Sequence, residues 1–213
     1  MSIATIPCRF TGAVGGVASL GRVPRKPRIQ VADGVYHVGS RGVEKRMIFD
    51  VFRGDRDLFL TLLELTVQKY GWLCHSYCLM GNHFHLVVET PKPNIAAGMQ
   101  YLKGRYATWF NQLTEREGAL FERRYFGELI ETEAHAFELT RYVVLNPVRS
   151  KLCAHPRDWP WSDYRAVVGL VKRPRYLQLT RIHDLFGEGP RGIALYEQFV
   201  EDGLALHELG AAA

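Results

Sequence analysis

The sequence predicts an α+β fold, and three observations lead to that prediction. Four short segments have strand character, namely Gly34–Ser40, Trp72–Met80, His83–Thr90 and Tyr125–Glu131. Longer segments with helical spacing or helix-starting residues separate these strands or follow the last one. The resulting order, β-α-β-β-α-β-α, is that of the split βαβ, or ferredoxin-like, core with one appended helix.

The first strand and the first helix are predicted from the spacing of apolar residues. Gly34–Ser40 alternates as a strand does when its two faces differ. Asp55–Tyr70 has the apolar spacing of a helix that packs against a sheet, with Leu58, Leu60, Leu62, Leu63, Leu65 and Val67. We therefore expect a strand followed by a helix that covers it.

The pair Gly81-Asn82 predicts a tight hairpin between the strands Trp72–Met80 and His83–Thr90. Glycine and asparagine are typical of two-residue hairpin turns because they tolerate unusual backbone angles. Pro91 closes the second strand, since proline cannot donate a backbone hydrogen bond to a sheet. These two strands should therefore be antiparallel neighbours.

Two further helices are predicted from residues at their ends. Asn94 has the side chain of an N-cap and begins a helix that should reach about Leu113. Thr132 is the expected cap of a last core helix, Glu133 to about Leu145. The Asn-Pro pair that follows should end this helix, because the residue before a proline is disfavoured in helical geometry.

The chain is expected to consist of three parts: a flexible basic leader at 1–27, a core domain at 28–150 and a C-terminal extension at 151–213 that packs on the core. The extension should be mostly helical, with short helices at Ile182–Phe186 and Arg191–Gly203. It also contains the aromatic segment Trp159–Tyr164, which we expect to pack back against the core.

Composition narrows the class of protein. The chain has 213 residues, 47% of them hydrophobic, which is enough for a real core. The formal net charge is +5 and the pI about 9.1, a weak indication of an anionic partner such as nucleic acid. The four cysteines show no disulfide framework, and no apolar run is long enough for a membrane span. We expect a cytoplasmic, nucleoid-associated protein with no membrane partner.

His83 and His85 flank Phe84 in a predicted strand. Because side chains alternate along a strand, both imidazoles leave the same face, where they can form half of a divalent-metal site. The alternative is that they are ordinary strand histidines satisfied by their neighbours. Their position directly after a tight hairpin favours the metal site, since residues at a strand end can face a cleft.

Tyr142 and Asn146 are four residues apart near the end of a predicted helix and therefore share one of its faces. A tyrosine held over a metal ion is suited to attack a phosphodiester and to become the covalent carrier. Two other readings remain open. Tyr142 could be a packing residue, and Asn146 could cap the turn that begins at Pro147.

Four separated motifs resemble the single-tyrosine HUH transposases, in the REP-associated tyrosine transposase branch of the insertion-sequence transposases. They are Gly81–Val88, Tyr36–Val38 with Ser40–Gly42, Tyr142–Arg149, and Trp159–Ser162 with Tyr164. The resemblance covers about residues 28–170. Four motifs in the right order are far more specific than the His-x-His pair alone.

The resemblance implies a ferredoxin-like catalytic domain that cleaves and rejoins DNA through a 5′-phosphotyrosine. It also implies Mg²⁺ or Mn²⁺ as cofactor. Carried over to this sequence, Tyr142 is the nucleophile, His83 and His85 are metal ligands, and Asn146 is the third ligand. The implied substrate is single-stranded or hairpin DNA, and members act as monomers or homodimers.

Phosphate contacts supply most of the affinity for DNA, so basic residues near the proposed site are candidates for DNA binding. These are Arg41, Lys103, Arg105, Arg123, Arg124 and Arg149. Any one of them could equally be an ordinary solvated residue.

Two other functions stay open on the sequence alone. The chain could be a binding module, derived from a transposase, that recognises hairpin DNA or RNA without cutting it. It could also be a metal-dependent nuclease of another class, in which water is the nucleophile and Tyr142 is structural. Only the tyrosine transposase forms a covalent protein–DNA adduct.

Overall fold

The computed structural model describes residues 29–211, with side chains through Leu206, so the expected leader at 1–27 lies outside the described residues. Four strands form one antiparallel sheet in the order β2-β3-β1-β4. Their bounds are β1 Gly34–Arg41, β2 Leu73–Leu79, β3 His83–Thr90 and β4 Phe126–Leu129. Each lies within two residues of its predicted bounds.

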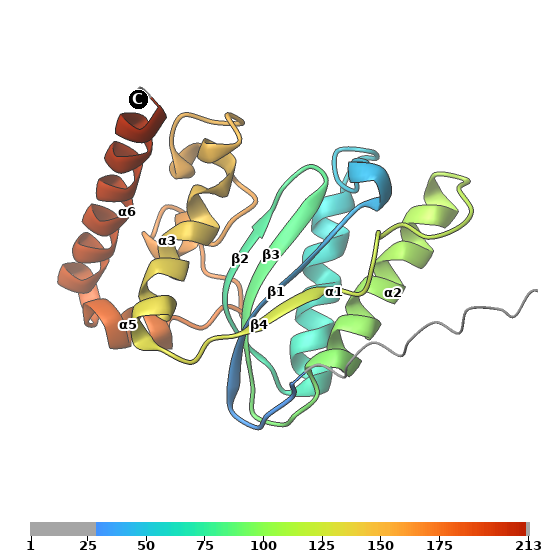
Figure 1. Ribbon diagram of the computed structural model, residues 1–213, viewed down its shortest axis with the longest axis horizontal. Helices are drawn as coiled ribbons and strands as arrows, with labels where there is room; N and C mark the ends of the chain where they lie inside the picture. The colour runs from blue at the N-terminus through green and yellow to red at the C-terminus, as the bar shows by residue number, and fades with distance from the viewer. Residues whose placement is uncertain (1–28, 212–213) are drawn as a thin grey trace, which may run out of the picture.

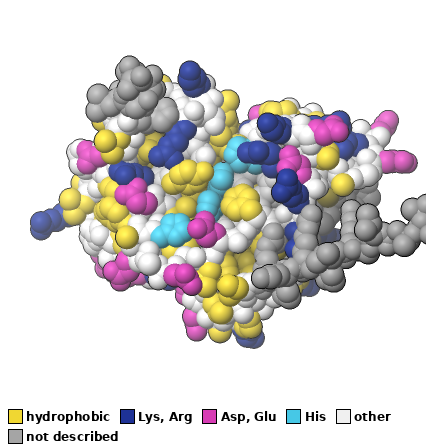
Figure 2. Space-filling model, in the orientation of Figure 1, with side chains coloured by type: hydrophobic (Ala, Val, Ile, Leu, Met, Phe, Trp, Pro, Cys, Tyr) yellow, Lys and Arg dark blue, Asp and Glu magenta, His cyan; other side chains and the backbone are white. Residues whose placement is uncertain are grey.

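Helices cover both faces of this sheet (Figure 1). On one face α1 (Asp55–Tyr70) and α2 (Ile95–Leu113) bury the main hydrophobic core. On the other face lies α3 (Glu133–Arg149), which packs through Leu139 and Val143. A row of histidine side chains follows this second face between the two halves of the molecule (Figure 2). The element order and sheet order confirm the predicted ferredoxin-like core with its appended helix.

The C-terminal part packs against α3 and also contributes Ala166, Tyr176 and Leu177 to the main core. It contains η2 (Pro156–Asp158), α4 (Tyr164–Val167), α5 (Thr180–Phe186) and α6 (Gly189–Ala211). Their apolar side chains form a separate cluster with Val144 and Leu145 of α3. The two predicted helices are present, and α6 is longer than predicted at both ends. Within residues 29–211, no helix combines the length and the apolar character needed to cross a membrane.

The aromatic segment after η2 covers the edge of the sheet, as predicted. The backbone N–H of Leu79 donates to the Trp161 carbonyl at 2.8 Å, and the Trp159 indole N–H donates to the Leu79 carbonyl at 3.1 Å. The buried Asp163 carboxylate accepts hydrogen bonds from the Ser76 hydroxyl and the Tyr77 backbone N–H. These hydrogen bonds pair backbone groups of Tyr77 and Leu79 on the side of edge strand β2 that faces away from β3.

Helix α3 does not end before Pro147, and that prediction is wrong: the helix continues to Arg149 with Pro147 inside it. Proline lacks the N–H that would bond to the carbonyl four residues earlier. The side-chain amide of Asn146 donates instead, to the Val143 carbonyl at 3.4 Å and to the Tyr142 carbonyl at 2.8 Å. The alternative role of Asn146, as a cap for a turn at Pro147, is therefore also wrong.

Asn94 precedes α2 as predicted, but its side chain does not cap the helix. It accepts a hydrogen bond from the Trp72 indole at 2.8 Å and donates to the Tyr70 carbonyl at 2.9 Å. Asn94 thus joins the start of α2 to the end of α1. The predicted cap of α3 is confirmed, since the Thr132 hydroxyl accepts from the His135 N–H.

The β2–β3 turn at Gly81-Asn82 is held from outside the hairpin. The Gly81 carbonyl accepts hydrogen bonds from the backbone N–H groups of Ile48 and Phe49, both at 2.9 Å. Neither turn residue has a positive φ, so glycine is not required here for its backbone angles. A Cβ at Gly81 would meet the end of the Met47 side chain, which is half exposed and would have to move aside.

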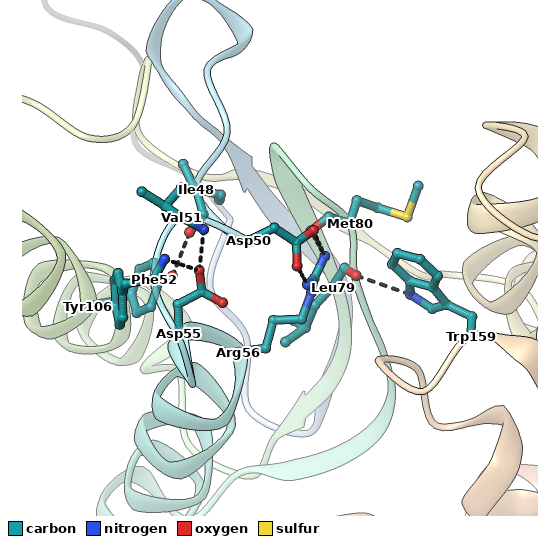
Figure 3. A network of polar contacts seen from close by, with 10 residues as sticks. All are labelled: Ile48, Asp50, Val51, Phe52, Asp55, Arg56, Leu79, Met80, Tyr106 and Trp159. Carbon is teal, nitrogen blue, oxygen red and sulfur yellow. Dashed lines mark hydrogen bonds and ion pairs between the residues drawn. The ribbon is translucent and has the colours of Figure 1, made fainter. Parts of the chain in front are cut away.

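Arg56 is the central residue of the polar network beside this turn (Figure 3). Its side chain is only 3% exposed, forms an ion pair with Asp50 and donates to the Met80 carbonyl at 3.3 Å. The guanidinium also lies 5.4 Å from the Trp159 ring centroid and 5.2 Å from that of Trp161. One buried cation therefore joins α1, the β2–β3 turn and the C-terminal segment.

We predict that Arg56→Met lowers the free energy of unfolding by about 2 kcal/mol, because it removes a charged hydrogen bond and two cation–π contacts together. The neighbouring exposed residue Arg53 supplies the control, since Arg53→Met should change stability by less than about 0.5 kcal/mol. Urea unfolding of the full chain measures both values. Equal stability of the two variants would contradict the role given to Arg56.

Candidate functional site

Three neighbouring histidines form a group on the sheet face that α3 covers. His83 and His85 belong to β3, and His37 belongs to the neighbouring strand β1. The ring centroids of His83 and His85 are 5.1 Å apart, as are those of His37 and His85. The alternation of β3 therefore does place its two histidines on one face, while Phe84 between them is buried in the core on the other.

Tyr142 of α3 lies over these rings. Its ring centroid is 5.9 Å from that of His85 and 5.9 Å from that of His37, with nearly perpendicular planes. The side chain is 39% exposed, so it reaches both the histidines and solvent. The Arg149 guanidinium lies 5.1 Å from the Tyr142 ring centroid. The predicted nucleophile, the two histidines and one predicted DNA-binding residue are thus brought together.

His83 is oriented by its neighbour in the turn. Its Nδ1 lies 2.7 Å from the Asn82 side-chain oxygen, and the Asn82 amide nitrogen donates to the Lys45 carbonyl at 3.0 Å. This second bond identifies which end of the Asn82 amide is the acceptor. His83 therefore carries its proton on Nδ1 and has a free lone pair on Nε2.

His37 is the site residue that sequence reasoning missed. Its Nε2 lies 2.9 Å from Nδ1 of His85, and the two rings are stacked at 22°. The signal was present in the Tyr36-His37-Val38 motif of the first strand, but no role was assigned to the histidine. The strand pairing was needed to show that His37 lies on the same face as His85.

Burial keeps all three imidazoles neutral at pH 7. Desolvation, with His135 nearby, lowers the pKa of His37 from 6.5 to about 4. Desolvation and the charge of Arg41 lower the pKa of His83 to about 4. Desolvation, aided by the other two histidines and Arg41, holds the pKa of His85 well below its usual value. Neutral imidazoles are the form that binds metal ions.

The donor atoms present fit a divalent cation. Asn146 donates its amide N–H groups to its own helix, and within the described part of the chain its Oδ1 accepts no hydrogen bond. An amide oxygen of this kind is a suitable ligand for Mg²⁺ or Mn²⁺. Among the described residues no three His, Cys, Asp or Glu side chains form a metal-binding group. A metal site here would thus combine the imidazoles of His83 and His85 with an amide oxygen.

Phe126 of β4 forms one wall of the site. Its ring centroid lies 5.1 Å from that of His37 and 5.6 Å from that of His85. Gly39 makes room for it, because a Cβ on Gly39 would collide with the Phe126 ring and the Phe84 carbonyl. The absence of one side chain in β1 therefore lets an aromatic ring close over the histidines.

The predicted DNA-binding residues fall into two groups. Arg41 is opposite His83 in the β1–β3 pairing, and the exposed Arg123 and Arg124 precede β4 and its Phe126. Of these, Arg41 is paired with His83, and Arg149 lies against the Tyr142 ring beside the histidines. Lys103 and Arg105 belong to α2, on the far side of the sheet: Lys103 donates to the Arg123 carbonyl, and Arg105 lies 5.4 Å from the Tyr101 ring centroid.

The two ends of this sheet face differ in charge. Arg41 marks the end of β1 near His83. At the other end a cavity of about 390 Å³ opens beside Val35 and Val87, and its lining includes Glu131, Glu133 and Asp184 with the single guanidinium of Arg181. Figure 2 shows dark blue Lys and Arg side chains at one end of the histidine row and magenta acidic ones near the other. A phosphate backbone is therefore favoured at the Arg41 end.

Comparisons with known proteins bear on this arrangement. The family described as "Transposase IS200 like" matches residues 32–145, which include all three histidines and Tyr142. A Haemophilus influenzae protein named as a candidate REP-associated tyrosine transposase is 24% identical over 117 residues, covering 50% of this chain. The match spans 66% of that relative, just under two thirds of its length.

A solved structure shows the same fold. A REP-associated tyrosine transposase, solved bound to a REP hairpin, superposes with a TM-score of 0.60 at 13% identity, over 74% of this chain and 94% of its own. A candidate transposase from Deinococcus radiodurans R1 gives a TM-score of 0.40 at 18% identity, over 56% of this chain and 95% of its own. The first likeness supports the ferredoxin-like core with its helical extension, and the second is too distant to add to it.

We predict that His37 makes stability depend on pH. Its folded-state pKa of about 4 lies below its unfolded value of 6.5, so the unfolded chain binds the proton more readily between these values. The contribution of neutral His37 to the free energy of unfolding is fully present above pH 6.5 and is lost as the pH falls toward 4. Urea unfolding in metal-free buffer gives the free energy of unfolding at pH 7.5, 6 and 5. Its change with pH should be smaller in His37→Gln than in the parent by roughly 1 kcal/mol per pH unit.

His183→Gln, outside the site on α5, is the matched control and should keep the pH dependence of the parent. Identical profiles for the parent and His37→Gln would contradict the prediction.

Proposed function

The chain belongs to the IS200-like transposase family, and on this premise we propose that it cleaves and rejoins single-stranded DNA through a covalent 5′-phosphotyrosine at Tyr142. The position of Tyr142 carries this proposal. Its partly exposed ring lies against His37 and His85 and beside the Arg149 guanidinium. A purely structural tyrosine has no need of this combination of neutral imidazoles, a cation and access to solvent.

The proposed reaction consists of two transesterifications. In the first, Tyr142 Oη attacks the scissile phosphorus, an O–P bond to tyrosine forms, and the bond from phosphorus to the 3′-oxygen breaks. The phenol loses one proton and the leaving 3′-oxygen gains one. In the second step a free 3′-hydroxyl attacks the phosphotyrosine and restores the phenol, so no energy source is consumed.

We further propose that Mg²⁺ or Mn²⁺ is the cofactor and that His83, His85 and Asn146 hold it. When bound, the ion supplies Lewis-acid polarisation of the scissile phosphate. The contributions of the chain itself are the neutral imidazoles, the hydrogen bonds that orient them, and the positive charge of Arg149 against the Tyr142 ring. Phe126 and the sheet exclude water from one side of the site.

The proposed substrate is a DNA hairpin or an unpaired strand, lying with its phosphates toward the Arg41 end of the site. The charge difference between the two ends of the sheet face supports this direction. We propose Arg41, Arg123, Arg124 and Arg149 as the phosphate contacts nearest the nucleophile. Lys103 and Arg105 would contact a substrate that continues around to α2.

Tyr142 lies against His37 and His85 of the same chain, which supports a proposed site contained in one copy. We therefore propose that a monomer suffices for one cleavage, with a homodimer needed only for paired cuts. The proposed catalytic domain is 28–150, followed by the extension at 151–213. As a DNA-acting protein it is proposed to work in the cytoplasm, associated with the nucleoid.

We predict that Tyr142→Phe abolishes a covalent protein–DNA adduct while leaving DNA binding within about threefold, because only the nucleophilic oxygen is removed. Labelled single-stranded oligonucleotides from the flanks of the gene are incubated with the full chain and Mn²⁺ and run on a denaturing gel. The parent should give a protease-sensitive shifted band, and His83→Ala should lose it as well.

Two results would lead to a different function. Cleavage without an adduct, retained in Tyr142→Phe, would indicate a nuclease that uses water. A native-gel shift with neither cleavage nor adduct in the parent would indicate a binding module.

We predict that Arg41→Gln weakens binding of a fluorescent DNA hairpin and lowers the slope of log K against log salt by about 1, because one phosphate contact is lost. Fluorescence anisotropy over a salt series measures both. The comparison variant is Arg105→Gln on α2. An unchanged slope in this variant would show that DNA stays on the histidine face. A decrease equal to that in Arg41→Gln would show that DNA also reaches α2. An unchanged slope in Arg41→Gln would contradict the proposed contact.

A further inference from the structure

Both histidines of β3 are engaged through the same ring nitrogen. Nδ1 of His83 is hydrogen-bonded to the Asn82 side chain at 2.7 Å, and Nδ1 of His85 is hydrogen-bonded to His37 at 2.9 Å. Each ring therefore has Nε2 as its one remaining donor atom for a cation. The two partners come from different elements, the β2–β3 turn and strand β1.

The orientation of Asn82 is determined by bonds on three sides. Its amide nitrogen donates to the Lys45 carbonyl at 3.0 Å, and its backbone carbonyl accepts from the Gly42 N–H at 2.8 Å. The remaining side-chain oxygen can only accept a hydrogen bond, so Nδ1 of His83 must donate. In a neutral imidazole this leaves Nε2 without a proton.

The backbone that meets Asn82 is in an unusual conformation. The short turn η1 (Val43–Lys45) has Glu44 at φ 54° and Lys45 at φ 59°, both in the left-handed region that residues with a Cβ rarely adopt. Two such residues in succession cost conformational energy and persist only where surrounding contacts hold them. One such contact is the hydrogen bond that the Lys45 carbonyl accepts from the Asn82 amide.

His37 is held as closely against His85. The stacked pair is buried, with His37 8% and His85 6% exposed, and Phe126 and Tyr142 pack on both rings. One proton lies between the two facing nitrogens. When His85 uses Nε2 for a cation, Nδ1 must carry that proton and His37 Nε2 must accept it.

We propose that Asn82 and His37 are positioning residues that hold His83 and His85 through Nδ1, so that both rings present Nε2 to one divalent cation. The proposal rests on the proposed function, in which these histidines bind Mg²⁺ or Mn²⁺. It adds two residues that act through the imidazoles of His83 and His85. It also gives a structural reason for the left-handed conformations of Glu44 and Lys45 in η1.

The tautomer of His83 is measured without metal or DNA. Long-range ¹H–¹⁵N correlation spectra of the full chain distinguish the proton on Nδ1 from the proton on Nε2, and His83→Ala identifies the signals of His83. The parent should show the Nδ1–H form of His83. Asn82→Leu should shift the ring toward the Nε2–H form, and Asn82→Asp, which keeps an acceptor, should restore the parent pattern.

The affinity for Mn²⁺ is the second readout, by isothermal titration calorimetry. Asn82→Leu and His37→Leu should each lower it by about 10- to 100-fold. Asn82→Asp and His37→Gln each keep an acceptor, and each should bind at least about tenfold more tightly than the matching leucine variant. Asn111→Leu removes an asparagine that donates to the Gly118 carbonyl far from the site and should bind like the parent.

The outcomes separate the two proposals. An Nε2–H tautomer of His83 in the parent, or leucine variants that bind Mn²⁺ as the parent does while His83→Ala does not, would overturn the positioning roles. Mn²⁺ binding by His83→Ala equal to that of the parent would overturn the metal site itself and, with it, the proposal. The expected tautomers together with the expected affinity series would support both.

Discussion

The buried guanidinium of Arg56 is the interaction on which the position of the site depends. A cation that is 3% exposed must find its partners within the protein, and Arg56 finds them in Asp50, the Met80 carbonyl and the rings of Trp159 and Trp161. These partners belong to three segments far apart in sequence (Figure 3). His83 begins β3 directly after the turn beside these contacts, so they help to fix the strand end that carries its ring.

The period of two along a strand divides the chemistry between the two faces of the sheet. In β3 the residues Phe84, Leu86 and Val88 enter the core under α1 and α2, while His83 and His85 face α3. The face that holds the core is thus mostly apolar, and the histidines are collected on the other. Helix α3 completes the site by bringing Tyr142 over this second face.

Local signals in the sequence predicted most elements, because strand alternation, helix spacing and the Thr132 cap act over a few residues. The same alternation predicted that His83 and His85 share a face. Other features depended on partners far along the chain. Asn94 bonds Trp72 and Tyr70 instead of capping α2, and His37 meets His85 only through the β1–β3 pairing. Helix α3 passes Pro147 because the Asn146 amide replaces the missing donor, a side-chain role that no propensity encodes.

Asn146 shows how one side chain can serve both the fold and the site. An amide has a donor end and an acceptor end, and α3 uses only the donor end, which bonds the Tyr142 carbonyl and the Val143 carbonyl that Pro147 would otherwise leave open. The acceptor end then remains available one helical turn beyond Tyr142. A carboxylate at this position would offer a metal ion a stronger ligand but could not donate to the helix. An asparagine before a proline therefore meets the needs of the helix and of the proposed site together. The helix uses the amide N–H groups, and the amide oxygen is left for a ligand.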